Sequence, residues 1–207
     1  MNVVAKSFPP YALPAVHTGL APVVGPNTVL LVLGSFPSAA SLRARQYYAH
    51  PRNQFWPLLA ALWPQHPQPG AHDYAGRCAW LLDRGLGLWD VYAACERSGS
   101  LDAAIRHGQR NDFSRIAQQC PRLAAIAHNG GESARHAAAV QSALAGLGRE
   151  QPTMASYRLP STSPAHAAWS FEHSQSSHGS TTRTAWQFAA CTSSTTSPVS
   201  CKRCASM

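Results

Sequence analysis

The chain has 207 residues, which is the size of one ordinary domain with room for a tail. Basic residues outnumber acidic ones by 17 to 9, and almost all of them are arginine, which favours a nucleic-acid partner, although an arginine-rich composition from a GC-rich coding sequence explains the charge equally well. No apolar run is long enough to cross a membrane and residues 1–20 lack the pattern of a secretion signal, so we expect a cytoplasmic protein that does not enter a membrane.

The first part of the chain predicts a leader, a strand and a binding site. Residues 1–28 are rich in proline and show little periodicity, which is typical of an extended leader that covers a sheet edge. Residues 29–33 are a short apolar run rich in Val and Leu, which predicts a buried strand of a parallel sheet. Residues 34–37 (GSFP) end this strand sharply, and ligands of open α/β sheets bind outside the carboxyl ends of strands, so we expect the site here.

The rest of the chain alternates between helical and strand patterns. We expect helices or helical turns at residues 41–46, 54–63, 73–83, 113–120 and 132–147, and strands at residues 85–91, 123–127 and 153–159. Ser100, followed by an acid in the first turn, predicts the cap of a further helix. Strands that alternate with helices predict an α/β fold, in which helices cover both faces of a parallel sheet.

The cysteines and the end of the chain give weaker signals. The six cysteines are scattered through a chain without a secretion signal, which predicts free thiols. Residues 173–207 are dominated by Ser, Thr and Ala, so we expect a poorly ordered tail. Cys201 and Cys204 have a CxxC spacing, but no further metal ligands are placed near them, and we expect no metal and no cofactor.

Several motifs in one order point to a known family. They are residues 34–38 (GSFPS), 47–56 (YYAHPRNQFW), 87–91 (GLWDV), 98–105 (SGSLDAAI), 127–130 (AHNG) and 159–167 (LPSTSPAHA). Together they resemble the uracil-DNA glycosylase superfamily, most closely its DNA-deoxyinosine (hypoxanthine-DNA) glycosylase branch, and the resemblance covers residues 29–172.

The resemblance implies a fold and an activity. The fold is a three-layer α/β/α domain with a short central parallel sheet. The activity is that of a monofunctional DNA glycosylase in base excision repair, which flips out a deaminated base from double- or single-stranded DNA and hydrolyses its N-glycosidic bond. We expect hypoxanthine as the first substrate and uracil as the second, an abasic product because no lysine is placed to form a Schiff base, and a monomer.

The resemblance places the catalytic residue at Asn53. An amide can both accept a hydrogen bond from a water and donate one, so it can orient that water near C1′ of the sugar. Asn53 also precedes a predicted helix, where an Asn is commonly a cap. Several related branches carry Asp or Asn in the loop after the first strand, whereas this chain has Ser35 after Gly34. This departure argues against strong uracil activity.

Four further residues are expected at the flipped base. Tyr48 matches an aromatic residue that stacks on the base, and its alternative is packing against Phe36 or Tyr47. Phe36 contributes a backbone N–H and a wall of the pocket. Asp90 ends the second strand and either accepts a hydrogen bond from the base or caps the following helix. Asn129 either braces the site or makes a turn, which Asn-Gly favours.

Four residues are expected at the DNA backbone. Ser161 and Ser163 belong to the second signature loop, which enters the minor groove, and they bind phosphates beside the lesion. His166 in the same loop contacts DNA or the leaving base. Arg52 contacts phosphate, with a solvated side chain as its alternative.

Two other functions and one departure remain open at this stage. The chain could be a nucleic-acid-binding module that keeps the fold without turnover. An iron–sulfur glycosylase is disfavoured, because Cys78, Cys95 and Cys120 do not supply the four spaced thiolates that a cluster needs. Relatives usually finish with a helix soon after the second signature loop, whereas this chain becomes Ser- and Thr-rich, so a divergent or frameshifted end is one hypothesis.

Overall fold

A parallel sheet forms the centre of the molecule. The computed structural model describes residues 16–145 and 154–164. Within them, four parallel strands pair in the order β3-β2-β6-β7. Their bounds are Leu30–Gly34 for β2, Leu86–Asp90 for β3, Ala125–Asn129 for β6 and Ala155–Leu159 for β7. All four strands predicted from the sequence are therefore present.

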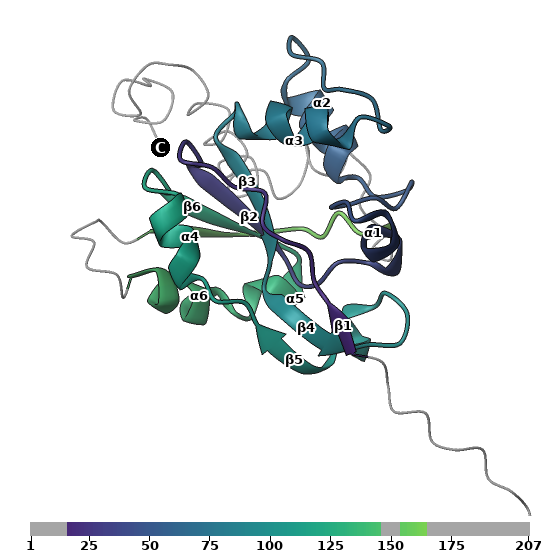
Figure 1. Cartoon of the computed structure of the whole chain (residues 1–207), viewed down its shortest axis with the longest axis vertical. Helices are drawn as coiled ribbons and strands as arrows, with labels where there is room; N and C mark the ends of the chain where they lie inside the picture. The colour runs from purple at the N-terminus through teal and green to yellow at the C-terminus, as the bar shows by residue number, and fades with distance from the viewer. Residues whose placement is uncertain (1–15, 146–153, 165–207) are drawn as a thin grey trace, which may run out of the picture.

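Helices lie on both sides of this sheet. Figure 1 shows α2 and α3 on one side and α4 and α6 on the other. The helices are α1 (Ala39–Ala44), α2 (Phe55–Leu62), α3 (Tyr74–Leu82), α4 (Ser114–Gln119), α5 (Gly131–Ala134) and α6 (Ala137–Ala145). The predicted three-layer α/β/α architecture is confirmed. The predicted helix at residues 132–147 is instead two helices, α5 and α6, separated at Arg135 and His136.

The strand β2 is the core of the fold. Every residue from Leu30 to Gly34 is buried, and Leu30, Leu31 and Leu33 have no exposed surface. The strand pairs with β3 on one side and β6 on the other, so both of its edges and both of its faces are covered. A continuous apolar run is typical of such a strand, because no side chain of it faces water.

A second, antiparallel sheet was not predicted. It consists of β1 (Val16–Thr18), β4 (Tyr92–Glu96) and β5 (Arg106–Arg110) in the order β1-β4-β5. All residues of β5 are exposed and polar or Gly, so the strand lacks the apolar alternation that identifies strands. The pairing with β4, rather than local propensity, makes it a strand.

The prediction of a helix capped by Ser100 is wrong. The segment between β4 and β5 contains one turn of 3₁₀ helix, η1 (Asp102–Ala104). The Ser100 hydroxyl does not cap it, because this oxygen accepts a hydrogen bond from the backbone N–H of Ala39 at 3.0 Å. Ser100 therefore ties its loop to the start of α1.

Residues 16–28 pack on both sheets. The strand β1 pairs with β4, and Val23 forms an isolated bridge with Leu88 of β3, which lies at the edge of the central sheet. This part of the expected leader does cover a sheet edge. Residues 1–15, the predicted tail at residues 173–207, and Cys201 and Cys204 lie outside the described residues.

Within the described ranges, three further expectations can be compared with the structure. Cys78, Cys95 and Cys120 are free thiols. No helix of residues 16–145 or 154–164 is long and apolar enough to span a bilayer. In the same residues, no group of three or more His, Cys, Asp or Glu side chains is arranged to hold a metal ion.

Candidate active site

A cavity of about 940 Å³ opens at the carboxyl ends of β2, β3 and β6, where the sequence predicts the site. The segments that follow these three strands line it, together with the 100–103 and 161–163 segments. Of the predicted site residues, the cavity brings together Phe36, Tyr48, Asn53, Asp90, Asn129, Ser161 and Ser163. Arg52 is exposed and does not line the cavity, and His166 lies outside the described residues.

Asn53 lines the cavity and also caps a helix, from the position just before the N-cap residue Gln54. Its Oδ1 accepts a hydrogen bond from the backbone N–H of Phe55, the first residue of α2, at 2.9 Å. Its own backbone N–H donates to the His50 carbonyl at 2.8 Å. The two alternatives considered for this residue are compatible, because the cap uses Oδ1 and fixes the side chain at the cavity wall.

Tyr48 stacks on an aromatic ring that the sequence analysis did not name. Its ring lies parallel to that of Phe55, with centroids 3.9 Å apart and planes at 21°. Tyr47 is more distant, with centroids 6.3 Å apart. Tyr48 also has a φ of 56°, which is uncommon for a residue with a side chain. Phe55 covers one face of the ring, and the residue also lines the cavity, so the packing holds Tyr48 in place at the cavity wall.

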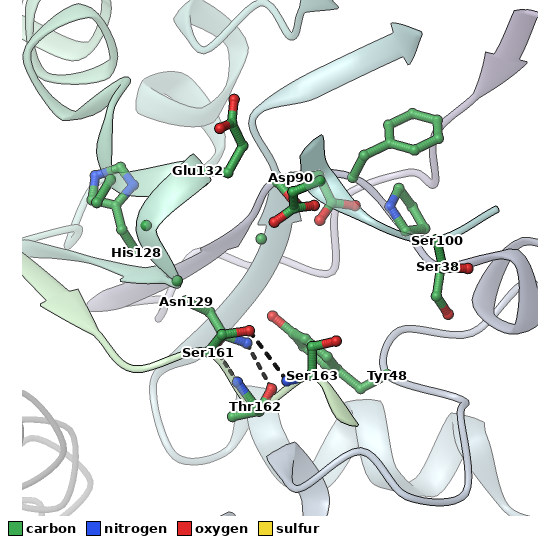
Figure 2. A pocket seen from close by; sticks show the side chains of 18 of the residues that line it. Ser38, Tyr48, Asp90, Ser100, His128, Asn129, Glu132, Ser161, Thr162 and Ser163 are labelled. Atoms are coloured by element: carbon green, nitrogen blue, oxygen red, sulfur yellow. Dashed lines mark hydrogen bonds between the residues drawn. The ribbon is translucent and has the colours of Figure 1, made fainter. Parts of the chain in front are cut away.

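Asp90 is a buried carboxyl group at the cavity floor (Figure 2). It is 4% exposed, and its Oδ2 has no hydrogen-bond partner among the described residues. Burial raises the pKa of Asp90 to about 8, Arg97 opposes this rise and Asp102 adds to it. No helix follows β3, so the helix-cap alternative for Asp90 is wrong. At neutral pH, Asp90 is therefore protonated in most of the molecules.

Gly34 makes room for the Asp90 carboxyl group. The two residues are neighbours across β2 and β3, and a Cβ at Gly34 would collide with Asp90 Oδ1. We expect Gly34→Ala to lower the free energy of unfolding by about 1–3 kcal/mol, because the added Cβ forces the buried Asp90 side chain out of its position. Urea denaturation of Gly34→Ala and Gly25→Ala measures this. Gly25 is the control, since its added Cβ would meet nothing closer than Leu82 Cδ2 at 3.9 Å, and equal stability of the two variants would contradict the expectation.

Asn129 braces the second signature loop. Its Nδ2 donates to Thr162 Oγ1 at 2.9 Å, and its Oδ1 accepts from the Thr162 backbone N–H at 3.0 Å, as the dashed lines in Figure 2 show. The Thr162 carbonyl in turn accepts from the backbone N–H of Gln54 at 3.0 Å. The turn itself is made by Gly130, whose φ is 107°. The loop is therefore fixed to the end of β6 and to the segment that contains Asn53.

The comparisons with known proteins agree with this geometry. Residues 21–190 match the family model described as the uracil DNA glycosylase superfamily. The chain belongs to this superfamily. It is 36% identical over 155 residues to a hypoxanthine DNA glycosylase of Methanosarcina acetivorans, which covers 75% of this chain and 91% of that protein. It is 37% identical over 118 residues to a hypoxanthine DNA glycosylase of Methanosarcina barkeri, which covers 57% of this chain and 73% of that protein.

A solved structure supports the same assignment. The solution NMR structure of a candidate uracil DNA glycosylase from Methanosarcina acetivorans superposes with a TM-score of 0.62 and 32% sequence identity, covering 78% of this chain and 93% of that one. This member of the uracil DNA glycosylase superfamily is accordingly a DNA glycosylase, a hydrolase of N-glycosyl bonds that acts on DNA.

The sequence analysis missed several charged residues of this glycosylase site: Asp102, Glu132, Arg135 and Arg158 line the cavity, and Arg97 lies behind its wall. Asp102 lines the cavity and accepts a hydrogen bond from the Ser35 hydroxyl at 2.5 Å. Arg97 is 5% exposed, lies over the Phe36 ring at 5.0 Å from its centroid, and donates to the Pro37 carbonyl. Both residues follow β3; Asp102 lies in the segment expected to be helical after Ser100, and Arg97 lies before it. Asp102 belongs to the SGSLDAAI motif at residues 98–105, and this motif could have indicated it as a site residue.

A buried histidine fixes the end of β6 against its neighbours. The Ser133 hydroxyl donates to the Leu33 carbonyl at 2.8 Å, so His128 Nδ1 must donate to this hydroxyl, at 2.9 Å. Burial, aided by His136, lowers the pKa of His128 to about 4, and the ring is neutral at physiological pH. This chain of hydrogen bonds joins β2, β6 and α5 beside the glycosylase cavity.

Proposed function

We propose that this DNA glycosylase removes hypoxanthine from DNA and leaves an abasic site, with uracil as a weaker second substrate. The two curated relatives, both named hypoxanthine DNA glycosylases, support the choice of base. The observation that carries the proposal is the cavity at the strand ends, which brings a polar amide, an aromatic ring and a buried carboxyl group to one place. A base that has left the helix needs these three kinds of contact.

In the proposed reaction, Asn53 orients the water that attacks C1′ of the sugar. Its Oδ1 is held by the cap of α2, so the amide group is already in position when the nucleotide enters. The water oxygen forms a bond to C1′, the bond between C1′ and the base nitrogen breaks, and the base leaves with the bonding electron pair. One proton of the water ends on the released base, so the reaction balances without a covalent enzyme intermediate. The described residues contain no lysine that could form one.

Asp90 and Tyr48 hold the base in this proposal. A protonated carboxyl group can donate one hydrogen bond and accept another, which matches the adjacent C=O and N–H groups of hypoxanthine and of uracil. The Tyr48 ring, which lines the cavity, stacks on the base, a contact worth about 1–3 kcal/mol. Phe36 supports the wall beside Arg97. Asn129 acts on the reaction through the loop that it braces.

Phosphate contacts come from the rim of the cavity. Ser161 and Ser163 lie on the braced loop, where the Ser161 hydroxyl accepts from the Ser163 backbone N–H at 3.2 Å. Arg135 and Arg158 are exposed and line the cavity, so their guanidinium groups can reach phosphates on either side of a flipped nucleotide. Arg52 is exposed on the neighbouring loop, and its phosphate contact, like the DNA contact of His166, stays a prediction.

Alkaline cleavage of labelled DNA tests the proposed function. Duplexes that contain a single hypoxanthine, uracil, xanthine or mismatched thymine are incubated with excess protein, and strand breaks report abasic sites. We expect hypoxanthine to be released fastest, uracil more slowly, and no break before alkali treatment. Binding to the same duplexes is measured in parallel. A folded protein that binds all four duplexes without releasing any base would contradict the proposal and favour a non-catalytic binding module.

A further inference from the structure

The strand β5 is an exposed, positively charged edge of the second sheet. It stands at one end of the strand order β1-β4-β5, and all of its residues, from Arg106 to Arg110, are exposed. The two arginines at its ends form no ion pair with a carboxylate of the described residues. An exposed arginine on its own is ordinary, so the surroundings of this strand decide what it can bind.

The carboxylates beside this strand make their contacts elsewhere. Glu96 lies opposite the strand on β4, and its Oε2 is 3.0 Å from His107 Nδ1. Asp112, just after the strand, accepts a hydrogen bond from the backbone N–H of Ser114 at 3.0 Å. Asp102, just before it, accepts from a hydroxyl on the cavity wall. The two arginines therefore keep their charge for a partner outside the described residues.

Arg106 is held at the rim of the active-site cavity. Its Nη1 donates to the carbonyls of Ala103 and Ile105, each at 2.8 Å, and Ala103 lines the cavity. Carbonyl oxygens orient a guanidinium group without cancelling its charge, and the group keeps further N–H donors for phosphate oxygens. The charge of Arg106 is thus positioned beside the cavity before DNA binds.

The other end of β5 is joined to the cavity through Tyr92 of β4. Tyr92 is the ladder partner of Arg110, and its ring packs so closely on Gly108 that a Cβ there would lie 2.6 Å from Cε1. The Tyr92 hydroxyl donates to Glu132 Oε1 at 3.0 Å, and Glu132 Oε2 accepts from Arg135 Nη1 at 2.9 Å. Glu132 and Arg135 both line the cavity. Figure 1 shows α5, which carries Glu132, next to β4, so β5 and the cavity wall belong to one surface.

We propose that β5 is a second DNA-binding surface, on which Arg106 and Arg110 contact backbone phosphates of the duplex on one side of the flipped nucleotide. A strand of this length spans about 13 Å, which equals the axial rise of about four base pairs. The surface adds affinity without reading sequence, because phosphate contacts carry no base information. This inference rests on the proposed function for the flipped nucleotide, but it is independent of which base is removed.

The salt dependence of binding tests this surface. Each phosphate contact adds about 0.9 to the slope of log affinity against log salt, so Arg106→Gln and Arg110→Gln should each reduce the slope by about that amount. Between 50 and 200 mM salt, the affinity advantage of wild type over either variant should shrink about threefold. Fluorescence anisotropy with an undamaged duplex measures both quantities.

Arg122→Gln is the matched control for these variants. Arg122 is exposed and precedes β6, so it lies at the opposite end of the central sheet from the cavity. Its substitution should leave both the slope and the rate of base release unchanged. Wild-type slopes in Arg106→Gln and Arg110→Gln, or an equal reduction in Arg122→Gln, would overturn the proposed surface.

The length of DNA on each side of the hypoxanthine provides a second readout, which a purely structural role of the arginines would not move. Shortening one flank to about three base pairs should weaken wild-type binding more than shortening the other. The double variant Arg106→Gln/Arg110→Gln should lose this asymmetry, and a double variant that kept it would contradict the surface. If wild type bound duplexes with this asymmetry but released no base from any of them, the proposed function would fail while the DNA-binding surface would stand.

Discussion

Asn53→Ala is expected to lower the single-turnover rate of hypoxanthine release by at least about 100-fold. The amide lines the cavity, and the helix cap holds its Oδ1 in place. Removal of the amide takes away the group that orients the attacking water, but it removes no charge. We therefore expect the affinity for a hypoxanthine duplex to stay within about threefold of wild type. Gel cleavage and fluorescence anisotropy measure the two quantities.

Because Asn53 also caps α2, Asn53→Ala changes both stability and catalysis, and a second variant separates the two effects. Loss of an N-terminal cap costs about 1 kcal/mol of stability, so Asn53→Ala will also unfold more easily. Asn53→Ser keeps an oxygen that can accept the hydrogen bond from the Phe55 backbone N–H, and it should restore most of the stability without restoring the rate. Recovery of activity in Asn53→Ser together with recovery of stability would show that Asn53 matters only as a cap.

Most of the central sheet could be predicted from the sequence because its strands β2, β3 and β6 are buried on both faces. The run at Leu30–Leu33 reads as apolar without interruption, and the strands that pair with it follow the same pattern. The antiparallel sheet carries no such signal. The strand β5 is exposed along its whole length, and its pairing with β4 is interrupted by register shifts, so nothing local distinguishes it from a loop.

The residues of the candidate site also fall into two groups, those that the sequence pattern predicts and those that it does not. Asp90 and Asn129 could be found because each ends a recognisable strand, and such ends meet at one edge of a parallel sheet. The contacts of Thr162 and Asp102 could not be predicted, because they depend on tertiary structure, although Asp102 lay within a quoted motif. Thr162 binds Asn129 across 33 positions of sequence, and Asp102 binds Ser35 across 67. The prediction named Ser161 and Ser163, on either side of the Thr that anchors the loop.

Asp90→Asn is expected to stabilise the folded protein at alkaline pH. Burial raises the pKa of Asp90 from 3.8 to about 8, so between these values the folded state holds a proton that the unfolded state releases. The free energy of unfolding of wild type therefore falls as the pH rises from about 4 to about 8. An amide does not titrate, and Asp90→Asn should lose this part of the fall. Each pKa unit is worth about 1.4 kcal/mol, and water that enters the cavity reduces the effect, so we expect a gain of about 2 kcal/mol or more at pH 8.5.

The same substitution should change the pH dependence of base release. The ionised carboxylate can only accept hydrogen bonds, so the proposed contact with the base loses its donor above about pH 8. Wild-type release of hypoxanthine should then fall about tenfold for each pH unit above the pKa of Asp90, whereas Asp90→Asn should show a flatter profile. Single-turnover rates between pH 6 and 9.5 measure this for both proteins.

The groups around Asp90 decide how this profile is interpreted. Arg97 and Asp102 are the charged side chains that shift its pKa, in opposite directions, and both remain in Asp90→Asn. The Tyr48 hydroxyl is also close, but burial raises its pKa far above the range of the experiment. If the rate of Asp90→Asn falls at high pH as the wild-type rate does, the fall comes from titration of the base or of another group. This result would contradict a role for protonated Asp90 in the reaction. A decline confined to wild type would assign the proton to Asp90, because the two proteins differ at no other titrating group.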